Sequence, residues 1–195
     1  MVSSANAIND AGQVVGSVVG TVTSFSSLRA FLYSGGVMQD LGTLPGGSYS
    51  EALAINAMGQ VVGAGITASG QLHAFLYSNG VMQDLGNFPG GDGSFANGIN
   101  DAGEVVGFGE SLSTRTEHAF LYSDGVMQDL NDLTSGSGWT LYGANAINNS
   151  GQIVGYGLNP SGQEDAFLLT PVPEPSSLVL LALGALGLTA RRRRR

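Results

Sequence analysis

Hydrophobic and polar positions alternate in short runs that recur every 44–48 residues along most of the chain. The phrase Ile-Asn-x-x-Gly-(Gln/Glu)-(Val/Ile)-Val-Gly begins at Ile8, Ile55, Ile99 and Ile147. A second phrase, Ala-Phe-Leu, begins at Ala30, Ala74, Ala119 and Ala166, and its first three copies continue as Tyr-Ser-x-Gly-Val-Met-Gln-Asp-Leu. Self-similarity at a fixed period indicates a repeat architecture. The chain therefore contains four copies of one unit.

Each unit predicts two antiparallel hairpins. The apolar runs around Ala-Phe-Leu and Val-Met-Gln are joined by Gly-Gly, Asn-Gly or Asp-Gly, dipeptides that tolerate the positive φ angles of a type I′ turn. A second turn is predicted at Asn9-Asp10-Ala11-Gly12, because Asn and Asp side chains bond their own backbone and Gly supplies a left-handed position. The same turn recurs at 57–59, 101–103 and 149–151.

Four short strands in about 45 residues match the size of a β-propeller blade. We expect an all-β, β-propeller-like array of about four four-stranded repeats, with units near 5–47, 51–91, 95–134 and 144–169 in a domain spanning 1–170. The innermost strands are predicted at 5–9, 52–56, 96–100 and 144–148, and Val-Met-Gln-Asp-Leu forms the outer edge. Phe31, Phe75, Phe120 and Phe167 are expected to pack between blades.

The fourth unit ends after Ala166-Phe167-Leu168-Leu169, so it lacks its outer strand. Four blades are enough for a small closed ring, and they also suit the end of a larger propeller. An array whose terminal blade is unpaired exposes apolar faces. The number of blades in the intact protein and its oligomeric state stay open at this point.

The residues ahead of each Ala-Phe-Leu carry a family resemblance. They are Arg29, His73, His118 and Asp165. Together with the repeated phrases, over roughly residues 5 to 169, they resemble the HAF repeat of proteins predicted to be extracellular. The second and third copies match the His-Ala-Phe core, whereas the first and fourth depart from it.

The C-terminal residues have the pattern of a targeting signal. Two prolines around Glu174 predict an extended, protease-accessible linker at 171–176. An uncharged segment follows at 177–190, expected as a short hydrophobic transmembrane helix, although about 20 residues are needed to cross a bilayer comfortably. The polyarginine tail at 191–195 is held on the cytoplasmic side by the positive-inside bias, which places the body outside.

These three parts resemble the PEP-CTERM sorting signal of exported bacterial surface proteins. The residues that carry the signal are Val172, Pro173, Glu174, Pro175, Arg191, Arg192, Arg193, Arg194 and Arg195. The resemblance implies recognition and cleavage by an exosortase-type sorting enzyme. It also implies transient anchoring in the inner membrane through the C-terminal segment, and final residence at the cell surface or outside the cell.

The charge and cysteine content of the chain limit the classes of partner and the cellular compartment that we expect. Five of the seven basic residues are the terminal arginines, which leaves two against 15 acidic side chains, a balance of −13. A protein that binds a phosphate backbone needs clustered cations, so nucleic acid is excluded as a partner. The lack of cysteine fits an exported protein without disulfides. Residues 1–20 show no secretory signal peptide, so we expect a fragment or a misassigned start codon.

His73 and His118 occupy equivalent repeat positions, which suggests a metal site across neighbouring blades. Arg29 at the same position argues against a ring of ligands and favours packing at strand edges. Asp40, Asp84 and Asp129 also recur, but calcium needs six to eight converging oxygens. Charges that discourage pairing between sheet edges explain these aspartates more simply. No metal, cofactor or catalytic group is assigned.

Three further features have a structural interpretation beside a functional one. The glycine-rich segment Gly90–Ser94 lacks the Lys and helix of a phosphate-binding loop, so it predicts a turn between blades. Trp139 and Tyr142 are the one aromatic cluster outside the repeat. Such residues are suited to stacking on a sugar ring, but we favour a plug for the gap left by the missing strand.

Two functions from different classes follow. The first is a noncatalytic surface or extracellular-matrix repeat protein, sorted through its tail and held in exopolysaccharide or a biofilm. The alternative is a secreted polysaccharide-acting propeller enzyme. It would use carboxylates among Asp92, Asp101, Glu104 and Glu110, with Trp139 as a sugar platform.

Overall fold

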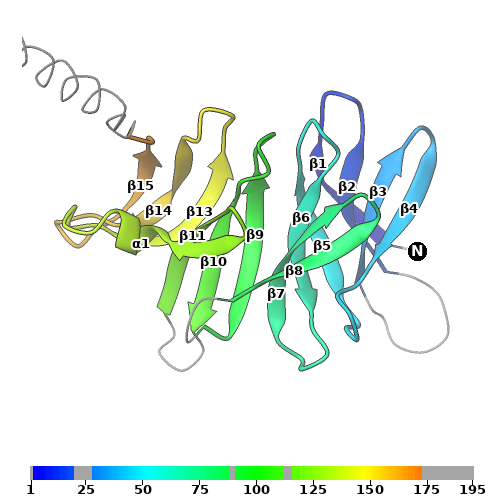
Figure 1. The fold of residues 1–195 in the computed structure, drawn as a ribbon, viewed down its shortest axis with the longest axis horizontal. Coiled ribbons are helices and arrows are strands. Elements are labelled where there is room, and N and C mark those ends of the chain that lie inside the picture. Colours follow the sequence, from blue (N-terminus) through cyan, green and yellow to red (C-terminus); the bar gives the residue numbers. More distant parts are fainter. Residues whose placement is uncertain (1, 20–27, 88–90, 112–115, 173–195) are drawn as a thin grey trace, which may run out of the picture.

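The computed structural model describes residues 2–19, 28–87, 91–111 and 116–172, which fold into four consecutive antiparallel sheets, here called blades (Figure 1). The first blade contains β1 (Val2–Ile8), β2 (Val14–Val19), β3 (Leu28–Ser34) and β4 (Val37–Gly42). The second contains β5 (Ser50–Ile55), β6 (Val61–Ile66), β7 (Leu72–Ser78) and β8 (Val81–Gly86). The third contains β9 (Gly93–Ile99), β10 (Val105–Ser111), β11 (Thr116–Ser123) and β12 (Val126–Asp129). After the short helix α1 (Leu130–Leu133), the fourth contains β13 (Thr140–Ile147), β14 (Ile153–Leu158) and β15 (Glu164–Leu169).

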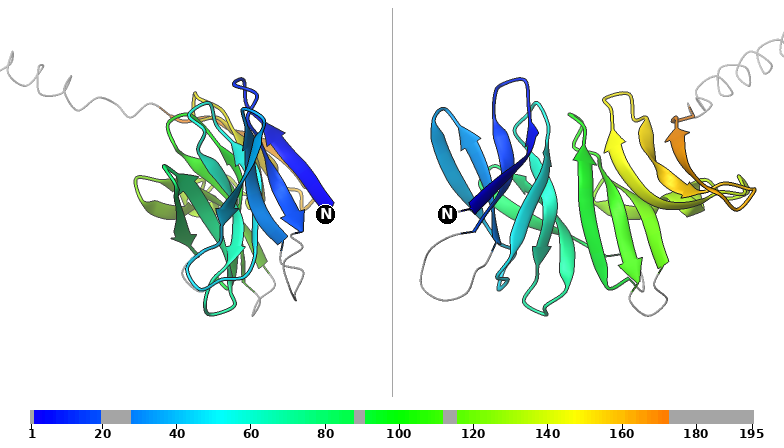
Figure 2. Two further views of the ribbon diagram at one scale, coloured as in Figure 1. Left: turned by 90° about the vertical axis from the view of Figure 1, so that its right-hand side faces the viewer. Right: turned by 180° about the vertical axis from the view of Figure 1, so that it is seen from behind.

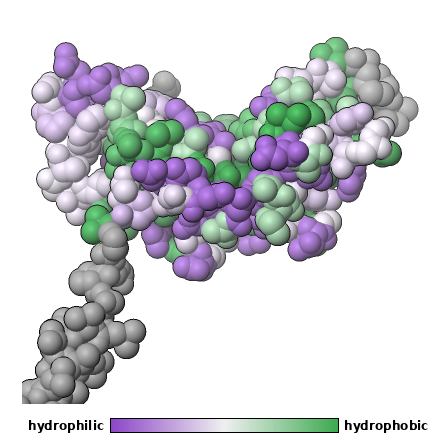
Figure 3. All heavy atoms as spheres, turned by 90° about the horizontal axis from the view of Figure 1, so that it is seen from above, coloured by the Kyte–Doolittle hydropathy of each residue, from purple (hydrophilic) through white to green (hydrophobic). Residues whose placement is uncertain are grey.

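Within every blade the strands pair in chain order, and among the residues that the structure describes the last blade has three strands instead of four. The second and third blades are joined by one parallel pair, Leu72 with Gly93, into an eight-stranded sheet. The blades stand side by side along the array, with the first and last at opposite ends (Figure 2). Seen from above they form an arc with a hollow between the end blades (Figure 3). The predicted all-β, propeller-like repeat is confirmed, and the array is open rather than closed into a ring.

The predicted hairpin turns between third and fourth strands are confirmed by their backbone angles. Both central residues of each turn have positive φ, as a type I′ turn requires. The values are 57° and 87° at Gly35 and Gly36, 52° and 83° at Asn79 and Gly80, and 53° and 82° at Asp124 and Gly125. Asn79 and Asp124 are the two residues other than glycine with positive φ among the described residues, so the turn sequence alone sets these hairpins.

The glycine that ends each Val-Val-Gly phrase is required by a bulge in the neighbouring strand. The pairing of β5 with β6 shifts register between Ala52 and Ala54, which brings the Glu51 carbonyl over Gly63. A Cβ on Gly63 would lie 1.9 Å from that oxygen. The equivalent glycines at 16, 107 and 155 meet a first-strand carbonyl at 1.8–2.0 Å. The repeat therefore keeps glycine at this position for steric reasons.

The hydrophobic core is divided into three layers, each lying between two blades. In the first layer Val15, Ala30 and Leu41 of the first blade meet Ala52, Val61, Phe75 and Tyr77 of the second. The same repeat positions form the second and third layers. Phe75, Phe120 and Phe167 belong to these layers, which confirms that they pack between blades. Phe31 is buried, at 3% exposed, but belongs to none of the three layers, so the prediction is not confirmed for the first blade. A single blade thus has no core without a neighbour.

The end of the chain leaves the last blade beyond β15. Pro171 lies over the turn at Gly151, and Val172 is 86% exposed. The rest of the predicted linker, the predicted helix at 177–190 and the polyarginine tail at 191–195 lie outside the described residues. Among the described residues no helix is long and apolar enough to cross a bilayer.

The bulge in β5 predicts that one added methyl group at Gly63 strongly destabilises the fold. We expect Gly63→Ala to lower the free energy of unfolding by about 3 kcal/mol, because the backbone of β5 must move to admit the Cβ. Gly93→Ala is the control, since its Cβ would make an ordinary contact of 3.5 Å with the Leu72 carbonyl. Urea denaturation followed by tryptophan fluorescence measures both. Equal stability of the two variants would contradict this explanation.

Candidate functional site

In each complete blade the residue before Ala-Phe-Leu pairs with the aspartate of the outer strand. The nitrogen to oxygen distances are 3.2 Å for Arg29 and Asp40, 2.8 Å for His73 and Asp84, and 2.6 Å for His118 and Asp129. In every pair the two residues are 11 positions apart. The pairing arises from the hairpin, which folds the residue before Ala-Phe-Leu back onto the aspartate of Val-Met-Gln-Asp.

Each aspartate also holds the backbone where the outer strand ends. Asp40 Oδ1 accepts the Gly42 N–H at 2.8 Å, and Asp84 Oδ1 accepts the Gly86 N–H at 2.8 Å. Asp129 Oδ1 likewise accepts the Asn131 N–H at 2.8 Å. The hairpin therefore gives each aspartate a side-chain partner and a backbone donor, and the predicted role of these charges in discouraging pairing between sheet edges stays a prediction.

The histidines do not meet each other. His73 and His118 lie in different blades, and each turns its Nδ1 to the aspartate of its own blade. Among the described residues no group of three or more His, Asp or Glu side chains is arranged to hold a metal ion. At the fourth copy Asp165 has no outer strand beside it and accepts a hydrogen bond from Asn159 at 2.6 Å. These positions act as structural pairs at the rim of the blades.

The four candidate carboxylates are divided between the two ends of the third blade. Asp101 accepts the Ala57 N–H and an Asn149 amide hydrogen, and Glu104 accepts from Asn100 at 2.6 Å. Asp92 and Glu110 lie at the other end of β10, where the Asp92 N–H donates to the Glu110 carbonyl at 2.8 Å. A strand of this length spans about 20 Å, so the structure does not bring these four acids into one site.

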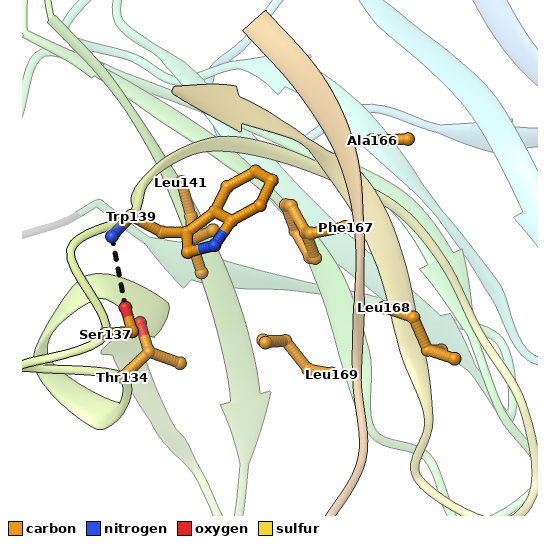
Figure 4. A pocket seen from close by; sticks show the side chains of 8 residues that line it. All are labelled: Thr134, Ser137, Trp139, Leu141, Ala166, Phe167, Leu168 and Leu169. Carbon is orange, nitrogen blue, oxygen red and sulfur yellow. Dashed lines mark hydrogen bonds between the residues drawn. The ribbon is translucent and has the colours of Figure 1, made fainter. Parts of the chain in front are cut away.

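A cavity of about 220 Å³ lies beside the free edge of the last blade. Its lining is Thr134, Ser137, Trp139, Leu141, Ala166, Phe167, Leu168 and Leu169. Figure 4 shows the Trp139 ring between Leu141 and Phe167, facing the side chains of β15. Trp139 also packs on the third core layer. The ring thus covers the side of the core from which an outer strand is missing.

Tyr142 points elsewhere and does not join Trp139. Its ring packs edge-on against Tyr156, with centroids 6.5 Å apart. The Tyr156 hydroxyl donates to Glu117 at 3.1 Å. Burial is the main cause that raises the pKa of Tyr156, and this hydrogen bond is the second. Burial and a hydrogen bond to Glu51 likewise raise the pKa of Tyr49 to about 12. Both phenols therefore stay neutral donors, and neither is set up as a nucleophile or base.

Two serines that connect neighbouring blades were not among the predicted residues. Ser50 Oγ accepts the Ala30 N–H at 2.9 Å and donates to the Gly42 carbonyl at 2.6 Å. Ser94 makes the same two bonds to Ala74 and Gly86, at 2.8 and 2.6 Å. The signal was present, since each serine stands two residues before the alanine of the first strand. In the described part of the glycine-rich segment, Ser94 therefore lies at a junction between blades.

The comparisons with known proteins support the sorting signal predicted at the C-terminus. Residues 171–195 match the family described as the PEP-CTERM protein-sorting motif. The chain thus carries the predicted sorting motif, which supports export and sorting by an exosortase. No curated protein matches the chain. The resemblance of the body to the HAF repeat stays a prediction.

Among solved structures, the chain is similar to the β-propeller domain of the Trilobed protease from Pyrococcus furiosus, which is described as having an open velcro topology. The TM-score is 0.56 at 11% identity, over 85% of this chain and 51% of that chain. The present chain therefore spans about half the length of this structure. At this identity the likeness concerns the fold alone, and it agrees with a propeller-like array.

The pairing with aspartate predicts which substitutions before Ala-Phe-Leu preserve the stability of the fold. We expect His118→Arg to change the free energy of unfolding by less than about 0.5 kcal/mol, because Arg29 pairs with its aspartate in the first blade. His118→Asp should cost about 1 kcal/mol, since it places two like charges opposite each other. Urea denaturation at neutral pH compares them. A larger loss for the arginine variant would refute the pairing.

Proposed function

We propose that the protein is an exported, noncatalytic surface or extracellular-matrix repeat protein. Its body is a propeller-like array of HAF-type repeats, and its tail is the substrate of an exosortase-type enzyme. The transmembrane segment at 177–190 anchors the chain in the inner membrane until that enzyme cuts after the Pro-Glu-Pro linker. The released body is held among exopolysaccharide at the cell surface or in a biofilm.

The sorting motif is the observation that carries this proposal. It matches from residue 171 onward, and the described chain leaves the body at the same point. Val172 is 86% exposed directly after the last strand. A membrane-bound enzyme can therefore reach the linker without unfolding the blades.

The body supports a noncatalytic role through the way its polar residues are used. Asp101 and Glu104 are hydrogen-bonded within and between blades, and the histidines are paired with aspartates at the rim. A general acid or base needs a reactive position within reach of its substrate. These groups instead hold the backbone and the neighbouring strands.

Cell fractionation tests the sorting. The chain is placed behind a secretory signal peptide, with one tag inserted after Ser69 in an exposed turn and another after Arg195, in a host that has an exosortase. We expect the internal tag in the surface or extracellular fraction and the C-terminal tag in the inner membrane. A triple alanine variant of Pro173, Glu174 and Pro175 should keep both tags together in the membrane.

Thr170→Ala is the matched control, because this exposed residue directly precedes the motif. It should be sorted like the unchanged protein. If both tags of the unchanged chain stay together in the cytosol, the proposed function is wrong. Separation of the tags in the triple variant would show that the Pro-Glu-Pro residues are not the signal.

A substrate screen separates this function from the alternative of a polysaccharide-acting enzyme. Incubation with a panel of polysaccharides should release no reducing ends. Should products appear, Asp92→Asn and Glu110→Gln would test the two acids that lie near each other at one end of the third blade. Loss of activity in either variant, with unfolding unchanged, would establish the enzyme instead.

A further inference from the structure

The two ends of the array expose opposite halves of the interface that joins the blades. We call the exposed side of the last blade the trailing face, with Asn145, Asn148, Asn149, Val154 and Ala166. The exposed side of the first blade is the leading face, with Ser3, Ala5, Ile8, Asn9 and Asp10. Every one of these residues has equivalents inside the array, where the corresponding interface is complete.

Exposure at equivalent positions shows that the end faces are unpartnered among the described residues. Val154 on the trailing face is 44% exposed, whereas its equivalents Val62 and Val106 are fully buried. On the leading face Ile8 is 67% exposed, and its equivalent Ile99 is 9% exposed. The apolar character of these positions therefore suits contact with a neighbouring blade, which the described residues do not supply at either end.

The hydrogen bonds that one repeated asparagine makes between blades all run in the same direction along the array. The asparagine of each Ile-Asn phrase donates through Nδ2 to the carbonyl of the same asparagine in the next blade. The distances are 3.0 Å from Asn9 to Asn56, 2.9 Å from Asn56 to Asn100 and 3.2 Å from Asn100 to Asn148. Asn148 continues this series at the trailing face, where its Nδ2 reaches only Gln152 of its own turn among the described residues.

Two further bonds run in the same direction. Asn6 donates to the Ala52 carbonyl at 2.8 Å, and Asn97 donates to the Ala144 carbonyl at 3.0 Å. In the turns, the Ala57 N–H donates to Asp101 and the Asp101 N–H donates to Asn149, both at 2.9 Å. The trailing face thus presents donors, and the leading face presents the acceptors that match them.

We propose that the trailing face of one copy of the protein docks on the leading face of a second copy and rebuilds the contact between blades. By repeat equivalence, Asn145 donates to the Ala5 carbonyl and Asn148 to the Asn9 carbonyl. The Asn149 N–H donates to the Asp10 carboxylate. Val154 and Ala166 cover Ala5 and Ile8, as their equivalents do inside the array.

A second copy is the occupant that these observations favour, because the two halves of the interface are present on one chain. The faces are complementary in the position of apolar side chains, in hydrogen-bond direction and in the order of the blades. They cannot meet within one arc, since the first and last blades lie at opposite ends (Figure 2). A head-to-tail contact either closes a ring or extends into a filament.

The last blade contributes no outer strand to this contact. The leucine of that strand, buried at Leu41 and Leu85 in the complete blades, is therefore missing from the interface between copies. We expect association to depend on concentration and to be weaker than the packing within the chain. This inference does not rest on the sorting of the tail.

Disulfide trapping tests the contact directly, because the chain contains no cysteine. Asp10→Cys and Asn149→Cys change one exposed residue on each face. Both residues occupy one repeat position, and inside the array the side chains at this position meet across the third and fourth blades, where Asn149 Nδ2 lies 2.7 Å from Asp101 Oδ2. The two full-length variants are mixed in mild detergent and oxidised. We expect a disulfide-linked pair in the mixture and at least about tenfold less in either variant alone.

Val81→Cys mixed with Asn149→Cys is the control, since Val81 is 65% exposed but lies at a hairpin of the second blade, away from both faces. A yield in the test mixture no higher than in this control overturns the proposal and leaves the faces to another partner. Efficient linkage of Asn149→Cys with itself would also overturn it, because like faces would then meet.

A second substitution separates docking from association through the tail. Val154→Asp, added to the Asn149→Cys chain, should lower the yield of linked pairs at least about tenfold, because it buries an unpaired carboxylate in the contact. Val81→Asp is the matched change away from both faces and should leave the yield unchanged. The tail is the same in every variant. An unchanged yield with Val154→Asp would contradict docking through the trailing face.

Discussion

The contact between neighbouring blades is the interaction on which this structure depends. Each sheet has few strands and an apolar face that it cannot bury by itself, so its core is completed by the next sheet. The three core layers are similar in composition because mostly the same repeat positions build them. The asparagine series adds direction, since every blade donates hydrogen bonds to the one that follows.

Magnitudes explain why apolar contact, and not the conspicuous charged residues, holds the array together. Full burial of a side chain such as Phe75 or Phe120 is worth about 1.5–3 kcal/mol, whereas an exposed ion pair contributes about 0.2–1 kcal/mol. The pair of Arg29 and Asp40 is 32% and 55% exposed and belongs to the second class. The recurring His and Asp residues are therefore adjustable rim contacts, which explains how arginine can replace histidine in one blade.

The functional signal that the comparisons support follows the blades in the chain. The repeats spend their polar residues on turns, rim pairs and junctions, while the sorting motif follows the last strand. The separation of the blades from the sorting motif has a physical advantage. The tail can be cut at an exposed linker without disturbing a core layer, because Val172 is exposed while the last buried phenylalanine, Phe167, belongs to β15.

Much of the local structure could be predicted because it depends on nearby residues. Asn79-Gly80 and Asp124-Gly125 set their hairpins by backbone preference alone. The buried phenylalanines followed from the repeat, since a large apolar side chain at the same place in each unit requires the same neighbour. The pairing of His73 with Asp84 was missed although its spacing of 11 residues recurs, because the two residues were considered separately rather than across a hairpin.

Other features depended on contacts between residues that are distant in the sequence. The glycine at position 63 is explained by the Glu51 carbonyl, which only the register of the bulged strand brings close. Asp101 and Glu104, two of the predicted candidates for catalysis, accept hydrogen bonds from Ala57 and Asn100, and only the folded chain reveals these contacts. A sequence states which acids are present, but the distance between them is a property of the folded chain.

By itself, the sequence determined the repeat, the hairpin turns and the sorting motif, because period, turn preference and a linear signal are properties of residues close together in the chain. The tertiary structure decided that the array is an open arc and which acids share one end of a blade. It also decided which apolar positions stay exposed at Val154 and Ile8. These outcomes depend on how each sheet is placed against its neighbour, and that placement results from packing between units rather than from any one of them.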